Sequence, residues 1–411
     1  MFSSVCVVGL GYIGLPTAAI LAAQGIHVTG VDVKESSVEA INAGHVPFVE
    51  PDLERFVVDA VGKGLLHAQT EPGPADVYIV AVPTPFHEDK SADLSYIEAA
   101  AKSIAPHLSG NELLILESTS PPGATHHMAD VVFESRPDLA DSGLLFAHCP
   151  ERVLPGRVMI ELVDNDRIIG GITPEAAERA ADLYRSFCKG ELLLTDATTA
   201  EMAKLVENSF RDVNIAFANE LSVIADKLGI DVWELIELAN HHPRVNILQP
   251  GPGVGGHCIA VDPWFIVSAA PDEARLIRSA REINDAKPGW VIDKVLAAAY
   301  GLDAPKVALL GLAFKPNIDD LRESPALAIA AQLADRMPTA QLLAVEPHVH
   351  ELPRQLAGRD NVTLTPLAEA LETADILVVL VDHDVFKAVP SDKVAGKHLV
   401  DTKGLWDRKK K

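Results

Sequence analysis

The chain opens with Val5-Cys6-Val7-Val8-Gly9-Leu10-Gly11-Tyr12-Ile13-Gly14, an apolar run that leads into the pattern GxGxxG. A helix of small residues is expected from Leu15 to Gln24, followed by an apolar strand from Ile26 to Val31 that ends at Asp32. Glycines at these positions permit a tight turn and let a pyrophosphate approach the free amides of the helix N-terminus. The alternative is an ordinary glycine turn in a βαβ unit. The full order of strand, glycine turn, helix, strand and acid indicates a Rossmann unit that binds a dinucleotide.

The acid after the second strand indicates which dinucleotide is bound. Asp32 can accept hydrogen bonds from both ribose hydroxyls and would repel a 2′-phosphate, which favours NAD over NADP. Two later strands, 76–82 and 113–116, lead into loops that carry Thr84 and Thr119 at the sheet edge where such folds bind ligands. Each threonine is a candidate NAD contact, with a turn or a helix cap as the alternative role. The glycine loop supplies the other expected NAD contacts, which are Gly9, Gly11, Tyr12, Ile13 and Gly14.

Length and composition limit the class of protein. The 411 residues exceed what one hydrophobic core usually organises, so two or three domains are expected. The net charge of −23 argues against nucleic acid and against an anionic membrane as partners. The four cysteines show neither disulfide nor metal-ligand spacing, which predicts reduced thiols, a cytoplasmic protein and no metal. No apolar run is long enough to span a membrane, and the N-terminus lacks the basic segment of a signal peptide.

The rest of the chain divides into a helical middle and a second α/β region. A capping box at Thr198-Thr199-Ala200-Glu201 predicts a helix that runs to Leu228. A later helical pattern from Asp272 is expected to break at Pro288. We therefore predict an α/β protein with two Rossmann-like doubly wound domains joined by a central helical region. The expected domains are 1–197 for NAD binding, 198–300 for dimerisation and catalysis, and 301–411 for a second nucleotide, since this last region lacks GxGxxG.

A glycine-rich stretch, Gly251-Pro252-Gly253-Val254-Gly255-Gly256-His257-Cys258, carries the cysteine best suited to chemistry. Glycines let this loop approach a ligand closely, and a thiol on such a loop is reachable, unlike a cysteine on a buried helix face. Asp262 places a carboxylate four residues later. The alternative is that Cys258 is a small buried residue followed by a strand at 259–261.

Other candidate groups lie upstream and downstream of this loop. Lys204, Asn208 and Arg211 fall on one stripe of the middle helix, which suits a site where negative charge develops. A solvated helix face is the alternative for that stripe. Glu151 follows an expected strand and is a possible base. Cations suited to an anionic ligand are Arg152 and Arg157 near Glu151, and Lys315 and Arg322 after the strand that begins at Lys306.

Taken together, these motifs resemble the UDP-glucose/GDP-mannose dehydrogenase family from end to end. The matching segments are VGLGYIG (8–14), ESTSP (117–121), CPER (149–152), ENSFRD (207–212), HPRVN (242–246), the Cys258 loop and GLAFKP (311–316). Within the family the chain is most similar to the branch that oxidises UDP-N-acetyl-D-mannosamine, with UDP-N-acetylglucosamine and UDP-glucose as alternative substrates. The UDP-glucose branch carries a second glutamate where this chain has Pro155, which makes UDP-glucose a poorer match.

The resemblance implies that a sugar C6 alcohol is oxidised to a carboxylate with two NAD⁺ in succession, for bacterial surface polysaccharide synthesis. Cys258 would capture the intermediate aldehyde as a thiohemiacetal, and the thioester formed next would be hydrolysed by water. The resemblance pairs Asp262 with Lys204. Acid–base chemistry, oxyanion binding and water positioning are assigned to Lys204, Asn208, Asp262, Glu151 and Thr119.

The resemblance also implies how the ligands and subunits are bound. Arg322 would reach the diphosphate of NAD, and contacts of this kind cross between subunits in the family. A homodimer built on the middle helices is expected. The residues implied to contact the UDP-sugar are Arg157, Val158, Lys204, Asn208, Arg211, His242, Arg244, Gly255 and Lys315.

Two other functions share part of this pattern. A two-electron hydroxyacid dehydrogenase has the same N-terminal fold and a catalytic lysine–asparagine helix, but it needs neither Cys258 nor a second nucleotide domain. A non-catalytic nucleotide-sugar sensor would keep Asp32 and Lys315 yet tolerate the loss of Cys258. The yield of NADH separates the three functions, because two, one or no equivalents per sugar are expected.

Overall fold

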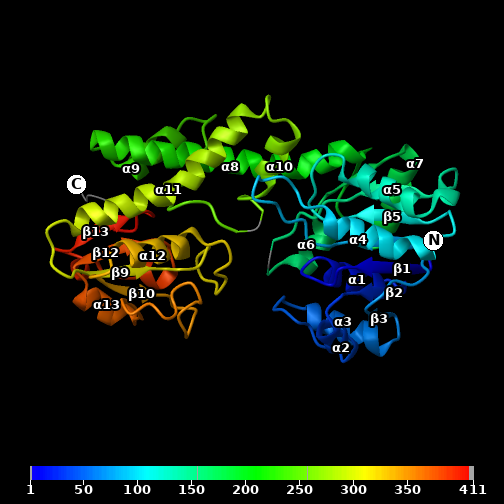
Figure 1. Ribbon diagram of the computed structural model, residues 1–411, viewed down its shortest axis with the longest axis horizontal. Coiled ribbons are helices and arrows are strands. Elements are labelled where there is room, and N and C mark those ends of the chain that lie inside the picture. The colour runs from blue at the N-terminus through cyan, green and yellow to red at the C-terminus, as the bar shows by residue number, and fades with distance from the viewer. Residues whose placement is uncertain (1, 155, 257, 407–411) are drawn as a thin grey trace. The chain divides into compact units, whose positions relative to one another are not determined.

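The computed structural model describes residues 2–154, 156–256 and 258–406, so the prediction made for Pro155 lies outside the described residues. The chain forms two compact units (Figure 1). The first comprises Met1–Glu207 with Ser268–Pro271, and the second comprises Asn208–Val267 with Asp272–Lys411. Among the described residues, no helix is long and apolar enough to cross a membrane.

The first unit is built on an eight-stranded sheet with the order β3-β2-β1-β4-β5-β6-β7-β8. The first six strands in this order are parallel, and β7 pairs antiparallel with β6. The order confirms the predicted doubly wound Rossmann arrangement. The strands are β1 (Ser4–Val8), β2 (His27–Val31), β3 (Leu66–Gln69), β4 (Val77–Val80), β5 (Leu113–Leu116), β6 (Leu145–His148), β7 (Arg167–Gly171) and β8 (Leu192–Asp196).

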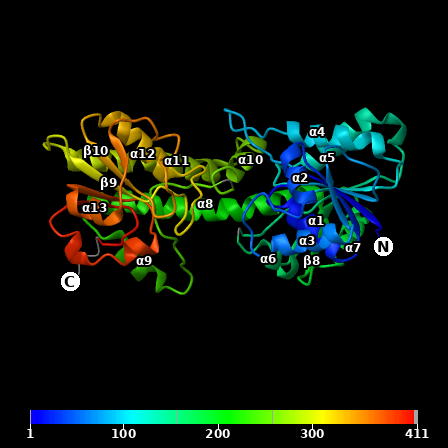
Figure 2. The ribbon, with the colours of Figure 1, turned by 90° about the horizontal axis from the view of Figure 1, so that it is seen from below.

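Helices cover both faces of this sheet, as Figure 2 shows for α4 and α5 on one side and α3 and α6 on the other. Strand β1 illustrates the reason, because its side chains alternate between two apolar cores. Val5 and Val7 pack in one core with α1, while Cys6 and Val8 pack in the other with α4 and α5. The helices are α1 (Gly14–Ala23), α2 (Glu35–Asn42), α3 (Leu53–Gly62), α4 (Ser95–Ile104), α5 (Ala124–Ser135), α6 (Val158–Asp164) and α7 (Pro174–Tyr184).

Helix α8 (Ala197–Leu228) begins one residue before the predicted capping box, and the cap assignment was wrong. The side chain of Asp196 caps the helix by accepting hydrogen bonds from the amide and hydroxyl of Thr199, at 2.9 and 2.6 Å. Glu201 instead accepts hydrogen bonds from the amides of Gly123 and Thr125, at 2.6 and 2.7 Å, where helix α5 starts. The glutamate therefore caps a helix far away in the sequence, which no local pattern reveals.

The second unit contains a five-stranded sheet in the order β11-β10-β9-β12-β13, with every pair parallel. Its core residues from α11 and α12 cover one face, and those from α13 and α14 cover the other. This confirms the second Rossmann-like half. The strands are β9 (Lys306–Leu310), β10 (Gln341–Val345), β11 (Val362–Leu364), β12 (Ile376–Val379) and β13 (His398–Asp401). The helices are α9 (Val232–Asn240), α10 (Asp262–Ala269), α11 (Arg275–Ala299), α12 (Pro325–Arg336), α13 (Leu367–Thr373) and α14 (Asp384–Lys387).

Helix α11 continues through Pro288, so the predicted break was wrong. Proline removes one backbone donor from a helix, but tertiary packing can outweigh that loss. Here Arg281 and Asn284, in the two turns before the proline, are 1% exposed and hydrogen-bonded to Asp212 of α8 at 2.6 and 2.8 Å. These contacts anchor the helix just before the position where the sequence favours an end, and the helix continues through it.

Candidate active site

The glycine loop after β1 leaves room for a dinucleotide. Gly9 has a φ of +97°, and a Cβ on Gly14 would lie 1.9 Å from the carbonyl oxygen of Gly9. A side chain is therefore excluded at both positions. A Cβ on Gly11 would meet no atom within 4 Å, so the loop is open at this glycine. The loop has the shape that a pyrophosphate at the start of α1 requires.

Two predicted NAD contacts at the sheet edge also fit. Asp32 is held by the amides of Leu10 and Lys34, whose hydrogen bonds to its two carboxylate oxygens measure 3.1 and 2.9 Å. The hydroxyl oxygen of Thr84 is buried without a hydrogen-bond partner among the described residues. A buried hydroxyl of this kind needs a partner, which a bound cofactor can supply. Thr119 is half-buried in the loop after the neighbouring strand β5.

Replacing Asp32 with alanine is expected to weaken NAD binding by about 10- to 100-fold, the value of one charge-assisted hydrogen bond of about 1.5–3 kcal/mol. Binding of NADP should improve relative to NAD, because the repulsion of a 2′-phosphate is removed. Fluorescence titration with both cofactors measures the two affinities. The Glu35→Ala variant, which removes an exposed carboxylate nearby, is the control and should bind NAD normally. Unchanged NAD affinity in Asp32→Ala would contradict the assignment.

The nucleophile candidate Cys258 lies on a turn immediately before α10. Its carbonyl oxygen accepts hydrogen bonds from the amides of Val261 and Asp262 at 3.0 and 2.8 Å, so residues 259–261 form a turn and not a strand. Cys258 is an exposed residue, whereas Cys6 and Cys149 are buried. Burial raises the pKa of those two thiols to about 11 and about 12. A nucleophilic thiol must be accessible to the substrate, and Cys258 meets this condition.

Two of the predicted catalytic residues are brought into direct contact. The Asn208 side-chain amide on α8 donates a hydrogen bond to the Asp262 carboxylate at 2.6 Å, and both residues are buried. Lys204 lies one turn earlier on α8 and is half-buried. Lys204 belongs to the first unit and Asp262 to the second, so their pairing stays a prediction.

A polar chain between α8 and α11 holds the start of the cysteine loop. The amide of Gly251 donates a hydrogen bond to the Asn219 side chain at 2.9 Å. Asn219 donates to Asn284 at 2.8 Å, and Asn284 donates to Asp212 at 2.8 Å. The loop is thus tied to the same buried residues that anchor α11 to α8, which fixes its position within the second unit.

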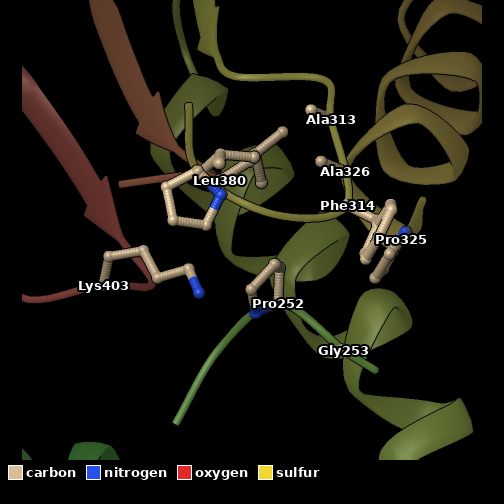
Figure 3. A pocket seen from close by; sticks show the side chains of 10 residues that line it. Pro252, Gly253, Ala313, Phe314, Pro325, Ala326, Leu380 and Lys403 are labelled. Carbon is tan, nitrogen blue, oxygen red and sulfur yellow. The ribbon is translucent and has the colours of Figure 1, made fainter. Parts of the chain in front are cut away.

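A pocket lies between the cysteine loop and the sheet edge of the second unit (Figure 3). The side chain of Lys403 points towards Pro252 there, and Phe314 lines the pocket from the loop after β9. Sequence reasoning missed Phe314 and Lys403. Both follow strands of a parallel sheet, at the edge where such sheets bind ligands, so that rule would have found them. The residues that line the pocket are Pro252, Gly253, Ala313, Phe314, Pro316, Pro325, Ala326, Leu380, Val381 and Lys403.

The other predicted residues of the second unit surround this region or lie exposed. Lys315 is exposed next to Phe314. A Cβ on Gly255 would lie 2.6 Å from the Glu323 carbonyl oxygen, so the cysteine loop packs tightly on the segment before α12. Arg322 is exposed and forms an ion pair with Asp320 at 2.6 Å. Also exposed are Arg211, His242 and Arg244.

In the first unit the predicted residues take different environments. Arg157 is exposed and paired with Glu161 at 3.3 Å. Val158 packs in the apolar core, and its amide donates a hydrogen bond to Glu50 at 2.8 Å, so its side chain is not available to a ligand. Glu151 is buried and paired with Arg167 at 3.2 Å. Tyr12 donates its hydroxyl to Glu50 at 2.8 Å, and Ile13 is half-buried beside it.

Glu346, His348 and His383 form a cluster of metal-ligand types in the second unit. The Glu346 carboxylate accepts hydrogen bonds from the amides of Leu312 and Ala313, at 2.7 and 3.0 Å, and lies 3.1 Å from the His383 ring nitrogen Nε2. These contacts hold the loop after β9, as Asp32 holds the glycine loop after β1.

Comparison with known proteins agrees with this geometry. Models of the UDP-glucose/GDP-mannose dehydrogenase family match the chain in three parts: the NAD binding domain at residues 3–188, the central domain at 198–286 and the UDP binding domain at 308–408. The chain belongs to this family. It is therefore an oxidoreductase that uses NAD, and the predicted recognition of the family is confirmed.

Individual relatives of the family cover nearly the whole chain. A UDP-N-acetyl-D-mannosamine dehydrogenase from Escherichia coli (strain K12) is 56% identical over 420 residues, which are 98% of this chain and 99% of that protein. An NDP-N-acetyl-D-galactosaminuronic acid dehydrogenase from Ralstonia nicotianae is 56% identical over 416 residues, which are 100% of this chain and 97% of that protein. The solved UDP-D-ManNAc dehydrogenase of Pyrococcus horikoshii has a TM-score of 0.87 and 38% identity, covering 98% of this chain and 96% of that one.

Proposed function

We propose that the enzyme oxidises the C6 hydroxyl of UDP-N-acetyl-D-mannosamine to the carboxylate of UDP-N-acetyl-D-mannosaminuronate, for bacterial surface polysaccharide synthesis. The observation that carries this proposal is the exposed Cys258 on a glycine-rich turn, in the unit that also holds the buried Asn208–Asp262 pair. An exposed thiol near a fixed amide suits covalent capture of an aldehyde. The substrate is taken from relatives 56% identical to this chain that act on this sugar.

The proposed reaction proceeds through the sulfur of Cys258. NAD, when bound, accepts a hydride in each of the two oxidations. Lys204 takes the proton from the C6 hydroxyl in the first, and the thiolate then adds to the aldehyde carbon to form a thiohemiacetal. Lys204 returns its proton to the alkoxide formed by this addition, and then takes the hydroxyl proton again as the C6 hydride leaves to bound NAD, which gives the thioester. Asn208 donates a hydrogen bond to the oxygen that carries negative charge in these steps.

Hydrolysis completes the cycle and returns the thiolate. Water loses a proton to Glu151 as its oxygen attacks the thioester carbon, and the carbon–sulfur bond then breaks. The products are the carboxylate and free Cys258. In this proposal Thr119 orders the water, while Asp262 keeps Asn208 oriented through their 2.6 Å hydrogen bond.

The UDP part of the substrate is proposed to bind to the second unit. Lys315 and Lys403 supply positive charge for the diphosphate, and Phe314 supplies an aromatic face for the uracil. The proposed sugar contacts are Arg157, Val158, Lys204, Asn208, Arg211, His242, Arg244 and Gly255, with Val158 contributing main-chain atoms only. Arg322 is proposed to reach the diphosphate of NAD.

A second candidate substrate is the N-acetylgalactosamine epimer. The relative from Ralstonia nicotianae named for N-acetyl-D-galactosaminuronic acid is also 56% identical to this chain. The two sugars share the C6 alcohol and the acetamido group but differ in ring stereochemistry. The same covalent chemistry serves both, so only the sugar contacts discriminate between them.

The test is the yield of NADH per mole of nucleotide sugar, measured at completion. UDP-N-acetylmannosamine should give two equivalents, with the N-acetylgalactosamine, N-acetylglucosamine and glucose sugars run beside it and turned over more slowly. If only one of the other sugars gives two equivalents, the substrate assignment is wrong but the proposed mechanism stands. One equivalent would indicate a two-electron enzyme, and none from any sugar would overturn the proposed function.

We also propose a homodimer built on the middle helices. Phe210, Phe217, Ile224 and Leu228 of α8 lie on one stripe of the helix and are all exposed. The opposite face of α8 is polar and buried, because Asn208, Asp212 and Asn219 point inwards. An apolar exposed face opposite a polar buried one is the pattern expected of a helix that pairs with a second subunit.

Replacing Phe217, which is 52% exposed, with aspartate is expected to shift the protein to a monomer in light scattering. The reason is that a buried, unpaired carboxylate at an interface is strongly unfavourable. The matched control is Val385→Asp on α14, where a side chain 48% exposed lies outside this stripe. The control should stay dimeric. A monomeric wild-type protein, or a dimeric Phe217→Asp variant, would contradict this interface.

Two further expectations belong to the proposal. The division into 1–197, 198–300 and 301–411 assigns NAD binding, dimerisation with catalysis, and UDP-sugar binding to successive parts of the chain. The cytoplasm is the proposed location, because Cys258 must remain a free thiol and a reducing compartment preserves it.

A further inference from the structure

Glu151 is held by a buried arginine on the next strand. The Arg167 guanidinium nitrogen Nη2 lies 3.2 Å from the Glu151 oxygen Oε2, and the other oxygen accepts a hydrogen bond from the Arg152 amide at 2.6 Å. Arg167 is 4% exposed and Glu151 is 8% exposed. Both line a hollow that also contains Asn165. The carboxylate therefore has a fixed orientation at the edge of a buried cluster.

A second carboxylate lies behind the arginine. Glu117, directly after β5, has an oxygen 3.8 Å from the Arg167 nitrogen Nη1 and is 1% exposed. Its oxygens contact the hydroxyls of Thr17 and Tyr184, each at 3.2 Å. Burial and the negative charge of Glu151 raise the pKa of Glu117 to about 7.

These contacts determine how the charges are distributed. One guanidinium cannot neutralise two ionised carboxylates, and an excess negative charge in a buried cluster is unfavourable. Below the Glu117 pKa of about 7, the proton therefore lies on Glu117, the carboxyl that is farther from Arg167, and Glu151 keeps the arginine as its partner. Neutral Glu117 still anchors the cluster through the two hydroxyls. The charged or titratable groups around Glu151 are Arg167, Glu117, Cys149, Arg152, Glu161, Asp166 and Tyr184.

We propose that Arg167 is the positioning residue for Glu151 in thioester hydrolysis, keeping that carboxylate ionised and aimed, with Glu117 as its neutral support. The inference rests on the proposed function, because it takes Glu151 as the base that activates water. It goes further by placing the control of the hydrolysis step on β7, at a residue outside the predicted site.

Replacing Arg167 with methionine should slow the hydrolysis step and leave the two oxidations in place. Rapid mixing should then show a burst of two NADH per active site followed by slow turnover. The UDP-sugar acyl adduct on Cys258 should accumulate in the intact mass. The acid limb of the turnover–pH profile should move upward, because the buried carboxyl cluster loses its cation.

Three further variants make the test decisive. Arg167→Lys keeps the charge, so its acid limb should stay in place; it also serves if the methionine variant does not fold. Glu117→Gln replaces a neutral carboxyl by an amide of the same shape, so its acid limb should also stay. Glu112→Gln is the control for loss of a buried carboxylate elsewhere in this unit, and should accumulate no adduct.

The outcomes separate the inference from the proposed function. A wild-type yield other than two NADH per sugar overturns the proposed function itself. With that yield intact, an unmoved acid limb and no adduct in Arg167→Met overturn the positioning role. The positioning role is also overturned if the NADH burst of Arg167→Met decreases by the same factor as its steady-state turnover. That result would show general structural damage. If the acid limb of Glu117→Gln moves by about one pH unit or more, the proposal that Glu117 is the neutral support is overturned.

Discussion

Replacing Cys258 with alanine is expected to abolish uronate formation, with turnover reduced on the order of 10⁴-fold or more, as for loss of a covalent nucleophile. The reason is that no other described residue offers an exposed thiol, because Cys6 and Cys149 are buried and Cys188 is only partly exposed. NAD binding should be unchanged, since the glycine loop after β1 lies in the other unit of the chain. Product formation is measured by chromatography of the nucleotide sugars, and NAD affinity by fluorescence.

The matched control is Cys188→Ala. This cysteine belongs to the first unit, is partly exposed, and its thiol contacts the carbonyl oxygen of Asn165 at 3.4 Å. The control should retain full turnover. Undiminished uronate formation in Cys258→Ala would exclude the covalent mechanism. Cys258 would then have only a structural role in its turn.

Replacing Arg281 with methionine is expected to lower the free energy of unfolding by about 3–5 kcal/mol, the usual effect of removing one partner of a buried ion pair. Arg281 is 1% exposed and pairs with Asp212, which is fully buried, and with Asp285 on its own helix. The substitution leaves the Asp212 carboxylate without its cation. Denaturant unfolding, followed by circular dichroism, measures the effect.

The loss should depend on pH in a defined direction. Burial already raises the pKa of Asp212 in the native protein, and Arg281 opposes that rise. Without the arginine the folded pKa rises further, so the folded state prefers the protonated carboxyl. The destabilisation should therefore be largest above that pKa and smaller in acid. The control is Arg275→Met on the same helix, an exposed position that should change stability by less than about 0.5 kcal/mol. Equal losses in the two variants would contradict this account.

The sequence alone determined the N-terminal half of the fold and the cofactor. The spacing of Gly9, Gly11 and Gly14, with Asp32 one strand later, requires a particular backbone path, because a Cβ on Gly14 would meet the backbone at 1.9 Å. Local rules of this kind depend only on residues near one another in the chain. The same applies to Cys258, whose glycine-rich turn is evident from the sequence.

Only the tertiary structure decided which polar residues are structural. Glu201 was predicted to cap its own helix, but it caps α5 through residues more than seventy positions away. Pro288 was predicted to end a helix, but α11 passes through it because Arg281 and Asn284 are anchored to Asp212. The partner of Glu151 is likewise a residue on another strand, Arg167. Each outcome depends on the free energy of burying a charged or polar group with a distant partner, which no local sequence pattern contains.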